Sequence, residues 1–215
     1  MLPIKLSMNK MHKQIIDLLV SKSLQVASDL KFKLASGRMS NIYIDCKKTT
    51  FNSKGKKLIG NLIFDRISDL NIKAIGGLML GAVPIADAVS QTSEDRGKPI
   101  DAFTVRVKPK EHGLEKTLEG DINPGDRVVI VDDVVTTGGS TIKAIEAARE
   151  FGLDIVKVIV LVDRQEGGRE NIENTGVKFE SIVTKEELID AYNTGRDREG
   201  SLSGQSIKSN KTICC

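Results

Sequence analysis

The sequence has no apolar stretch long enough to cross a membrane, because its longest apolar runs have the length of a single strand. It also lacks the apolar segment of a secretory signal peptide near its first residues. Cysteine is scarce, and Cys46, Cys214 and Cys215 provide neither a disulfide framework nor a zinc-binding spacing. We therefore expect a cytoplasmic protein that does not bind a membrane.

A large excess of charge is also absent. The chain has 32 Lys and Arg against 29 Asp and Glu, and its formal net charge of +3 does not argue for nucleic-acid binding. Its 215 residues, 40% hydrophobic and 28% charged, are typical of one α/β domain with a small appendage. The G-x-x-x-x-G-K-[ST] pattern of Walker-type nucleotide sites does not occur.

Segments with strand and helix periodicity alternate along the chain, which predicts an α/β fold with a mostly parallel central sheet flanked by helices. Helices are expected over 8–20, 56–70, 83–92, 141–150 and 184–192, and strands over 32–34, 42–44, 73–75, 102–105, 128–131, 155–162 and 177–183. We divide the chain into an N-terminal helix with a small hood (1–50), an α/β core (51–194) and a polar tail (195–215). The tail has little to bury, so we expect it to be disordered.

The most specific pattern is a β-branched run, Val128 to Val131, that leads into two adjacent carboxylates, Asp132 and Asp133. Such a run is typical of a strand buried on both faces, and open α/β sheets bind ligands at the carboxyl ends of their strands. There the acids could accept hydrogen bonds from ribose hydroxyls or hold Mg²⁺ through water. A strand, turn and capped helix without a ligand is the alternative, but it gives two adjacent acids no obvious use.

A turn of hydroxyls and glycines follows the acids and precedes a predicted helix. Its glycines allow successive N–H groups to point into one concavity, and the helix N-terminus and the hydroxyls add donors. The arrangement suits a terminal phosphate monoester. Its residues are Thr136, Thr137, Gly138, Gly139, Ser140 and Thr141.

The segment 128–141 resembles the binding motif for phosphoribosyl pyrophosphate (PRPP) of the type I phosphoribosyltransferases. The resemblance implies that family's fold, with the 5′-phosphate in the turn and with Asp132 and Asp133 at the ribose hydroxyls or at Mg²⁺ held mainly by PRPP. A second glycine-punctuated turn follows the strand expected at 73–75. In the family this turn takes the pyrophosphate, here through Leu80, Gly81 and Ala82, although a turn that serves only packing would look similar.

The segment 106–113 resembles the catalytic loop of the orotate phosphoribosyltransferases, with Arg106, Lys110, His112 and Gly113 matching position for position. The resemblance implies that these cations cover the pyrophosphate and stabilise its departure, and that the loop reaches into the partner's site in a homodimer. With Asp133 they form the expected catalytic set. A solvated surface loop is the alternative. The second histidine, His12, is expected at the surface of the first helix.

Two further segments extend this resemblance, namely 32–45, which is similar to the family's base-binding hood, and 162–168, which is similar to its strand end facing orotate. The planar guanidinium of Arg164 suits the carboxylate and imide edges of orotate. The orotate contacts implied are Arg164, Thr136, Ser36 and Gly37. The chain departs from the family pattern at Ala35, Leu80 and Val107, where members have Lys in some or most cases.

These resemblances imply an enzyme that transfers the phosphoribosyl group from PRPP to orotate, giving orotidine 5′-phosphate and pyrophosphate in pyrimidine (UMP) biosynthesis. Two alternatives stay open: the same transfer to another base, such as a purine, and a PRPP-sensing regulator with this fold but no turnover. The intact catalytic loop argues against the regulator. The terminal Cys214-Cys215 could be a prenylation signal, although it does not fit the C-a-a-X pattern.

Overall fold

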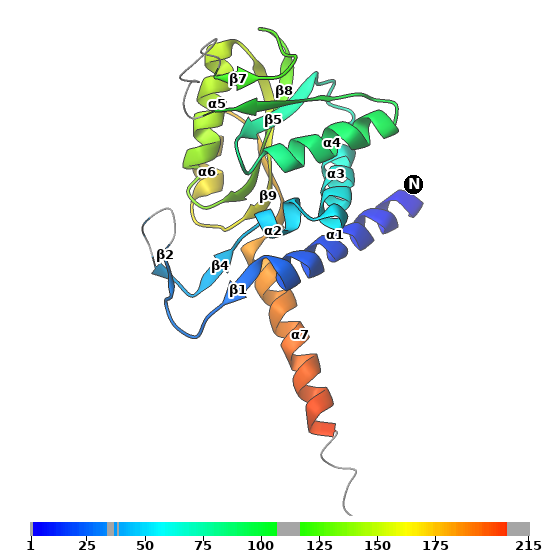
Figure 1. The fold of residues 1–215 in the computed structure, drawn as a ribbon, viewed down its shortest axis with the longest axis vertical. Helices are drawn as coiled ribbons and strands as arrows, with labels where there is room; N and C mark the ends of the chain where they lie inside the picture. Colours follow the sequence, from blue (N-terminus) through cyan, green and yellow to red (C-terminus); the bar gives the residue numbers. More distant parts are fainter. Residues whose placement is uncertain (1, 34–36, 38, 107–116, 206–215) are drawn as a thin grey trace, which may run out of the picture.

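The structure is a computed structural model that describes the chain except for residues 1, 34–36, 38, 107–116 and 206–215, and for 2–7 and 197–205 it describes the backbone only. At its centre lies a six-stranded sheet in the order β10-β9-β8-β5-β6-β7 (Figure 1). All neighbouring strands are parallel except β6 and β7. The strands are β5 (Ala74–Leu78), β6 (Asp101–Val105), β7 (Leu118–Glu119), β8 (Arg127–Val135), β9 (Asp154–Asp163) and β10 (Phe179–Thr184).

Helices cover both faces of this sheet, as Figure 1 shows. They are α1 (Leu2–Lys22), α2 (Lys47–Thr50), α3 (Ser53–Ile67), α4 (Val83–Asp95), α5 (Gly139–Phe151), α6 (Gly168–Glu173) and α7 (Lys185–Gln205). In β8, Val129 and Val131 pack with α1, α3 and α4, whereas Val128 and Ile130 pack with α5 and α6. Successive side chains of a strand point to opposite faces, so this strand is buried on both. The predicted fold class is confirmed.

The N-terminal segment adds two small antiparallel pairs beside the main sheet. β1 (Leu24–Val26) pairs with β4 (Ile42–Ile44), and β2 (Phe32–Lys33) pairs with β3 (Met39–Ser40). The rings of Phe32 and Tyr43 stack with their centroids 5.5 Å apart. We call β1 to β4 the hood. Its strands at 32–33 and 42–44 lie where the sequence predicted them, whereas β1 and β3 were not predicted.

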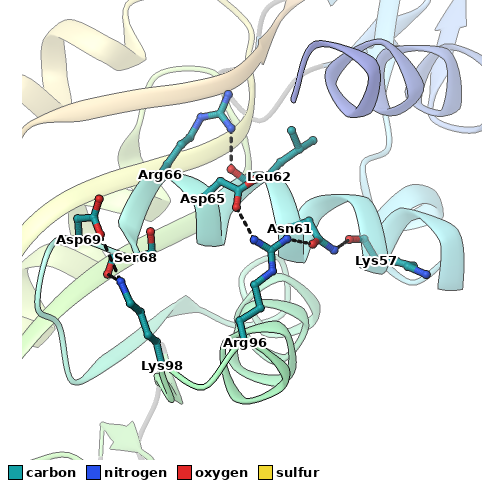
Figure 2. Close-up of polar contacts among 9 residues, drawn as sticks. All are labelled: Lys57, Asn61, Leu62, Asp65, Arg66, Ser68, Asp69, Arg96 and Lys98. Carbon is teal, nitrogen blue, oxygen red and sulfur yellow. Dashed lines mark hydrogen bonds and ion pairs between the residues drawn. The ribbon is translucent and has the colours of Figure 1, made fainter. Parts of the chain in front are cut away.

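Polar contacts fix α4 against α3 at the far end of α4 from its first turn (Figure 2). Arg96 Nη1 donates to Asp65 Oδ1 over 2.7 Å, and Arg96 Nη2 also donates to Asn61 Oδ1. Lys98 Nζ donates to Asp69 Oδ1 over 3.3 Å. Because α4 begins directly after the turn 79–82, these contacts hold the helix that carries this turn.

Helix α7 differs from the sequence-based prediction. Its start is as expected, since Thr184 Oγ1 accepts from Glu187 N and Thr184 N donates to Glu187 Oε2 in a capping box. The helix then continues through Gln205, although disorder was expected from 195 onward. The guanidinium of Arg196 lies 5.6 Å from the centroid of the Tyr192 ring. This contact joins two residues one helical turn apart and supports helical structure at Gly195. Residues 206–215 of the predicted tail lie outside the described residues.

Two further elements go beyond the residues that the sequence patterns marked. β8 continues through both acids to Val135, because Asp132 and Val134 pair with Val160 and Val162 of β9. α6 was not predicted, since its six residues are too few to show helical periodicity. In the part of the chain that the structure describes, no helix is long and apolar enough to cross a membrane.

Candidate active site

The carboxyl ends of β5, β8 and β9 lie side by side at one edge of the sheet. β8 carries Asp132 and Asp133 near this end, β5 leads into the turn 79–82, and β9 leads into Arg164. The acid pair, the second glycine turn and the arginine, which lie far apart in the sequence, therefore meet in one place. It is the edge at which open α/β sheets bind ligands.

Asp132 is almost fully buried, with 6% of its surface exposed, and both of its carboxylate oxygens have partners. Oδ2 accepts hydrogen bonds from Ser140 Oγ at 3.0 Å and from Thr141 Oγ1 at 2.8 Å, and Oδ1 accepts from the N–H of Asp133 at 2.9 Å. Burial, followed by the charge of Asp133, raises the pKa of Asp132 to about 6, against the opposing effect of these hydrogen bonds. The two hydroxyls that the sequence assigned to phosphate therefore hold this carboxylate.

Asp133 is equally buried but less well satisfied. Within the described part of the chain its Oδ2 has no hydrogen-bond partner, and the ammonium group of Lys47 lies 3.9 Å away. Burial raises the pKa of Asp133, and the charge of Lys47 opposes this rise. A buried carboxylate oxygen without a donor costs free energy, so it is an acceptor available to a ligand.

The turn 79–82 packs directly on the acid pair. A Cβ on Gly81 would lie 2.5 Å from Asp133 Oδ1 and 3.0 Å from Asp132 Oδ1, so only glycine allows this approach. Within the turn, the Met79–Leu80 peptide bond is cis, Leu80 is exposed and Ala82 is buried. The backbone of this turn therefore lies beside the two carboxylates.

The turn between β8 and α5 presents an open helix N-terminus. Gly138 has φ +84°, a left-handed conformation that favours glycine, and α5 has no side-chain cap there. The first N–H groups of a helix have no partner within the helix, and the space around Gly139 is open. Thr136 is half-buried and Thr137 is exposed. Helix α6 contacts this turn, since Asn171 Nδ2 donates to Thr137 O over 3.0 Å. An anion can reach these donors.

Arg164 is buried to 4% exposure and points toward the hood. Its Nε donates to Glu166 Oε1 over 3.1 Å, and its Nη2 donates to Ile42 O of β4 over 3.5 Å. The following residue, Gln165, has φ +56° and donates its N–H to Asp163 Oδ1 over 2.8 Å. The ion pair between Arg164 and Glu166 is therefore largely buried.

The remaining predicted residues lie elsewhere or are not described. Ser36, Lys110 and His112 lie outside the described residues, and Gly37 lies exposed in the hood with φ +82°. Arg106 follows β6 at the sheet edge, where its Nη1 lies 3.3 Å from Glu119 Oε1.

His12, which was expected at the surface of the first helix, is partly exposed. Its side chain is 31% exposed, and its Nε2 lies 2.9 Å from Ile182 O and 3.5 Å from Glu187 Oε1. Helix α1 packs against β10 and α7, which places the ring between elements distant in the sequence.

The donor set does not form a complete metal site. Among the residues that the structure describes, no group of three or more His, Cys, Asp or Glu side chains could hold an ion. Asp132 uses both oxygens internally, and Asp133 offers Oδ2. These residues fit an ion that takes most of its oxygen ligands from a bound phosphate ester and contacts the protein through water.

A doubly wound sheet with an acid pair beside an open helix N-terminus is the arrangement expected of a phosphoribosyltransferase. The family model described as "Phosphoribosyl transferase domain" matches residues 49–189. The chain belongs to this family and, within it, to the orotate phosphoribosyltransferases. It is 46% identical over 172 residues to an orotate phosphoribosyltransferase of Aquifex aeolicus, covering 80% of this chain and 94% of the relative. An enzyme of that name from Pyrococcus horikoshii is 42% identical over 191 residues, covering 88% and 99%.

A solved structure supports the same assignment. The orotate phosphoribosyltransferase of Mycobacterium tuberculosis H37Rv in complex with PRPP superposes with a TM-score of 0.69 at 32% identity. The match covers 83% of this chain and 98% of that one. The resemblance read from the sequence is therefore confirmed.

Sequence reasoning missed two side chains at this edge, Lys47 and Glu166. Lys47 is one of many lysines in the chain, and no motif distinguishes it. The positions of both side chains depend on tertiary contacts, which local patterns do not encode.

Proposed function

We propose that the protein transfers the phosphoribosyl group of PRPP to orotate, giving orotidine 5′-phosphate and pyrophosphate in pyrimidine (UMP) biosynthesis. The observation that carries the proposal is the buried pair Asp132 and Asp133, placed between an uncapped helix N-terminus and a glycine turn. The relatives that match nearly their whole length to this chain bear the name of this activity.

The turn 136–141 binds the 5′-phosphate in this proposal. Its backbone N–H groups and the positive end of the α5 dipole favour an anion, and the hydroxyls of Thr136 and Thr137 add donors. Ser140 and Thr141 have a second task, because their hydroxyls orient Asp132. The phosphate and the carboxylate are thereby held in a fixed relation to each other.

The two acids bind the ribose hydroxyls. The hydroxyl hydrogens of ribose are donors, and the unpartnered Asp133 Oδ2 is an acceptor of the required kind. Cleavage of the bond between C1 and pyrophosphate leaves an oxocarbenium-like sugar, which orotate N1 attacks. The chain needs no nucleophilic side chain for this step, since positioning and charge stabilisation suffice.

Mg²⁺ fits the site as an ion held mainly by PRPP, with Asp132 and Asp133 in contact through water. When bound, it would neutralise charge on the departing pyrophosphate. The turn at Leu80, Gly81 and Ala82 would bind that pyrophosphate through backbone N–H groups.

Arg106, Lys110 and His112 close over the pyrophosphate in this proposal, and in a homodimer the loop serves the partner's site. Mixing inactive Asp133→Ala with inactive Lys110→Ala chains should then restore part of the activity. No recovery after confirmed subunit exchange would count against a shared site.

Arg164 recognises orotate, together with Thr136, Ser36 and Gly37. The guanidinium is held rigidly by Glu166 and by the backbone of β4, so little entropy is lost when a planar carboxylate binds. A reducing cytoplasm is the proposed location, because the described cysteine, Cys46, is a free buried thiol.

The test is a panel of bases assayed with PRPP and Mg²⁺. Orotate absorbance should fall as orotidine 5′-phosphate forms, while adenine, guanine and uracil remain unchanged. Turnover of a purine with no change in orotate would overturn the substrate. Tight PRPP binding with no turnover of any base would instead favour the regulator.

A further inference from the structure

We propose that Lys47 is a positioning residue of the ribose site, whose ammonium group lies near the buried carboxylate of Asp133 and the partly exposed carboxylate of Asp45 and fixes the orientation of Asp133. The inference rests on the proposed role of Asp133 in binding ribose. It concerns a residue of α2, the short helix that follows the hood, acting on a residue of the sheet.

The geometry around the ammonium group carries the proposal. Lys47 Nζ lies 3.9 Å from Asp133 Oδ2 and 3.8 Å from Asp45 Oδ1. Both oxygens are buried, and neither has a hydrogen-bond partner among the residues that the structure describes. A buried carboxylate oxygen without a donor costs free energy. Because both oxygens lie near one ammonium group, the positive charge of Lys47 offsets part of that cost.

The backbone beneath Lys47 is rigid. Lys47 opens the short helix α2, whose Thr49 Oγ1 lies 2.7 Å from Ser23 Oγ in a buried hydrogen bond. The N-terminal end of α3 packs on the same helix, since a Cβ on Gly55 would lie 2.1 Å from Thr49 O. Asp45 N donates to Ser23 O over 3.0 Å. The lysine therefore extends from a fixed base toward the acid pair.

Asp133 is held from two sides. The turn at Gly81 packs on Oδ1, and Lys47 faces Oδ2. The contact with the turn is one of packing, whereas the contact with Lys47 is electrostatic. At 3.9 Å, Lys47 leaves Oδ2 open to a hydrogen-bond donor. Removing the ammonium group would let the carboxylate turn away from the ligand, with little loss of packing because half of the Lys47 side chain is exposed.

The experiment compares Lys47→Met with Lys48→Met, a matched control on the same helix that is exposed and has no described ion pair. Both variants lose one positive charge. For Lys47→Met we expect KM for PRPP to rise about tenfold and KM for orotate to change less than about twofold. Lys47→Arg should restore most of the loss, and Lys48→Met should behave as the wild type. Equal behaviour of Lys47→Met and Lys48→Met would overturn the proposal.

A double-mutant cycle separates this inference from the proposed function. The dissociation constant for PRPP with Mg²⁺ is measured calorimetrically for the wild type, Lys47→Met, Asp133→Asn and the double variant. If Lys47 acts through Asp133, the effect of Lys47→Met vanishes in the Asp133→Asn background. Additive effects would overturn the proposal and leave the ribose role of Asp133 intact. Unchanged binding by Asp133→Asn would overturn the ribose role itself.

A purely structural role gives a different result. In that case Lys47→Met and Lys47→Arg would lower the unfolding midpoint together, and both substrates would lose affinity to the same extent. That outcome also overturns the proposal, because a residue that positions Asp133 should separate PRPP from orotate.

Discussion

The hydroxyl of Thr141 donates to Asp132 Oδ2 over 2.8 Å, which ties the first turn of α5 to the end of β8. Thr141 is buried to 1% exposure, so this bond is shielded from water. The helix that would bind a phosphate and the strand that would bind a ribose are thereby linked through this hydrogen bond and the one from Ser140. Removal of the Thr141 bond should disturb both.

Replacing Thr141 with Val removes that donor while keeping the shape of the side chain. We expect the free energy of unfolding to fall by about 1–3 kcal/mol, because a buried carboxylate loses a charge-assisted hydrogen bond. Ser140→Ala removes a weaker bond at 3.0 Å from an exposed residue and should cost less. Urea denaturation of both variants checks the order. A larger loss in Ser140→Ala would show that Asp132 does not depend on Thr141.

Asp132→Asn tests the cost of the buried charge. Asn can keep the same partners, because the hydroxyls of Ser140 and Thr141 can accept as well as donate. Burial raises the folded-state pKa of Asp132 from 3.8 to about 6, so folding favours the protonated acid. The wild type therefore loses stability as the pH rises from about 4 through 6, and Asp132→Asn should lose less, because only the raised pKa of Asp133 still contributes.

The expected result is a variant that is more stable at pH 8 by roughly 1–3 kcal/mol, with the gap closing by pH 4. Its affinity for PRPP should be lost, since the charge serves the ligand. Melting temperatures across this pH range make the measurement. A variant less stable than the wild type at pH 8 would mean that the hydrogen bonds outweigh the burial of charge.

The strand of the site was predictable because its signal is local. The run Val128 to Val131 is uniformly apolar, and the structure sends its side chains alternately to two cores, as a strand buried on both faces requires. Asp132 and Asp133, which were expected at the carboxyl end of this strand, lie within it. Pairing with β9 continues through the acids, so the ladder overrides the usual exclusion of charge from a strand interior.

The contacts that the hood and α2 make with the edge of the sheet could not be predicted in this way. Arg164 reaches Ile42 O, and Lys47 reaches Asp133, across long separations in the sequence. Each depends on how two elements dock, which no periodicity records. The hydroxyls of Ser140 and Thr141, which the sequence pattern assigned to a phosphate, also donate to Asp132, and this contact was not predicted.

Gly81→Ala should weaken the binding of PRPP. The added Cβ would lie 2.5 Å from Asp133 Oδ1, so the carboxylate or the turn must move. We expect affinity for PRPP to fall at least about tenfold, which corresponds to 1.4 kcal/mol. Gly195→Ala, in the exposed part of α7 with open space around it, should bind PRPP as the wild type does. Titration calorimetry gives both values, and equal affinities would show that Asp133 tolerates the shift.

Arg164→Lys tests the recognition of the base. Lysine cannot reproduce the planar fork that donates to Glu166 and to Ile42 O, so the substitution is not conservative here. We expect KM for orotate to rise roughly tenfold to a hundredfold, the range for losing one or two charge-assisted hydrogen bonds, with little change in the affinity for PRPP. Arg149→Lys is the control, since that exposed arginine lies in the last turn of α5 and donates to Thr175 O over 2.8 Å. Steady-state kinetics with each substrate varied in turn makes the comparison. If PRPP affinity falls as much as orotate affinity, Arg164 holds the hood in place and does not read the base.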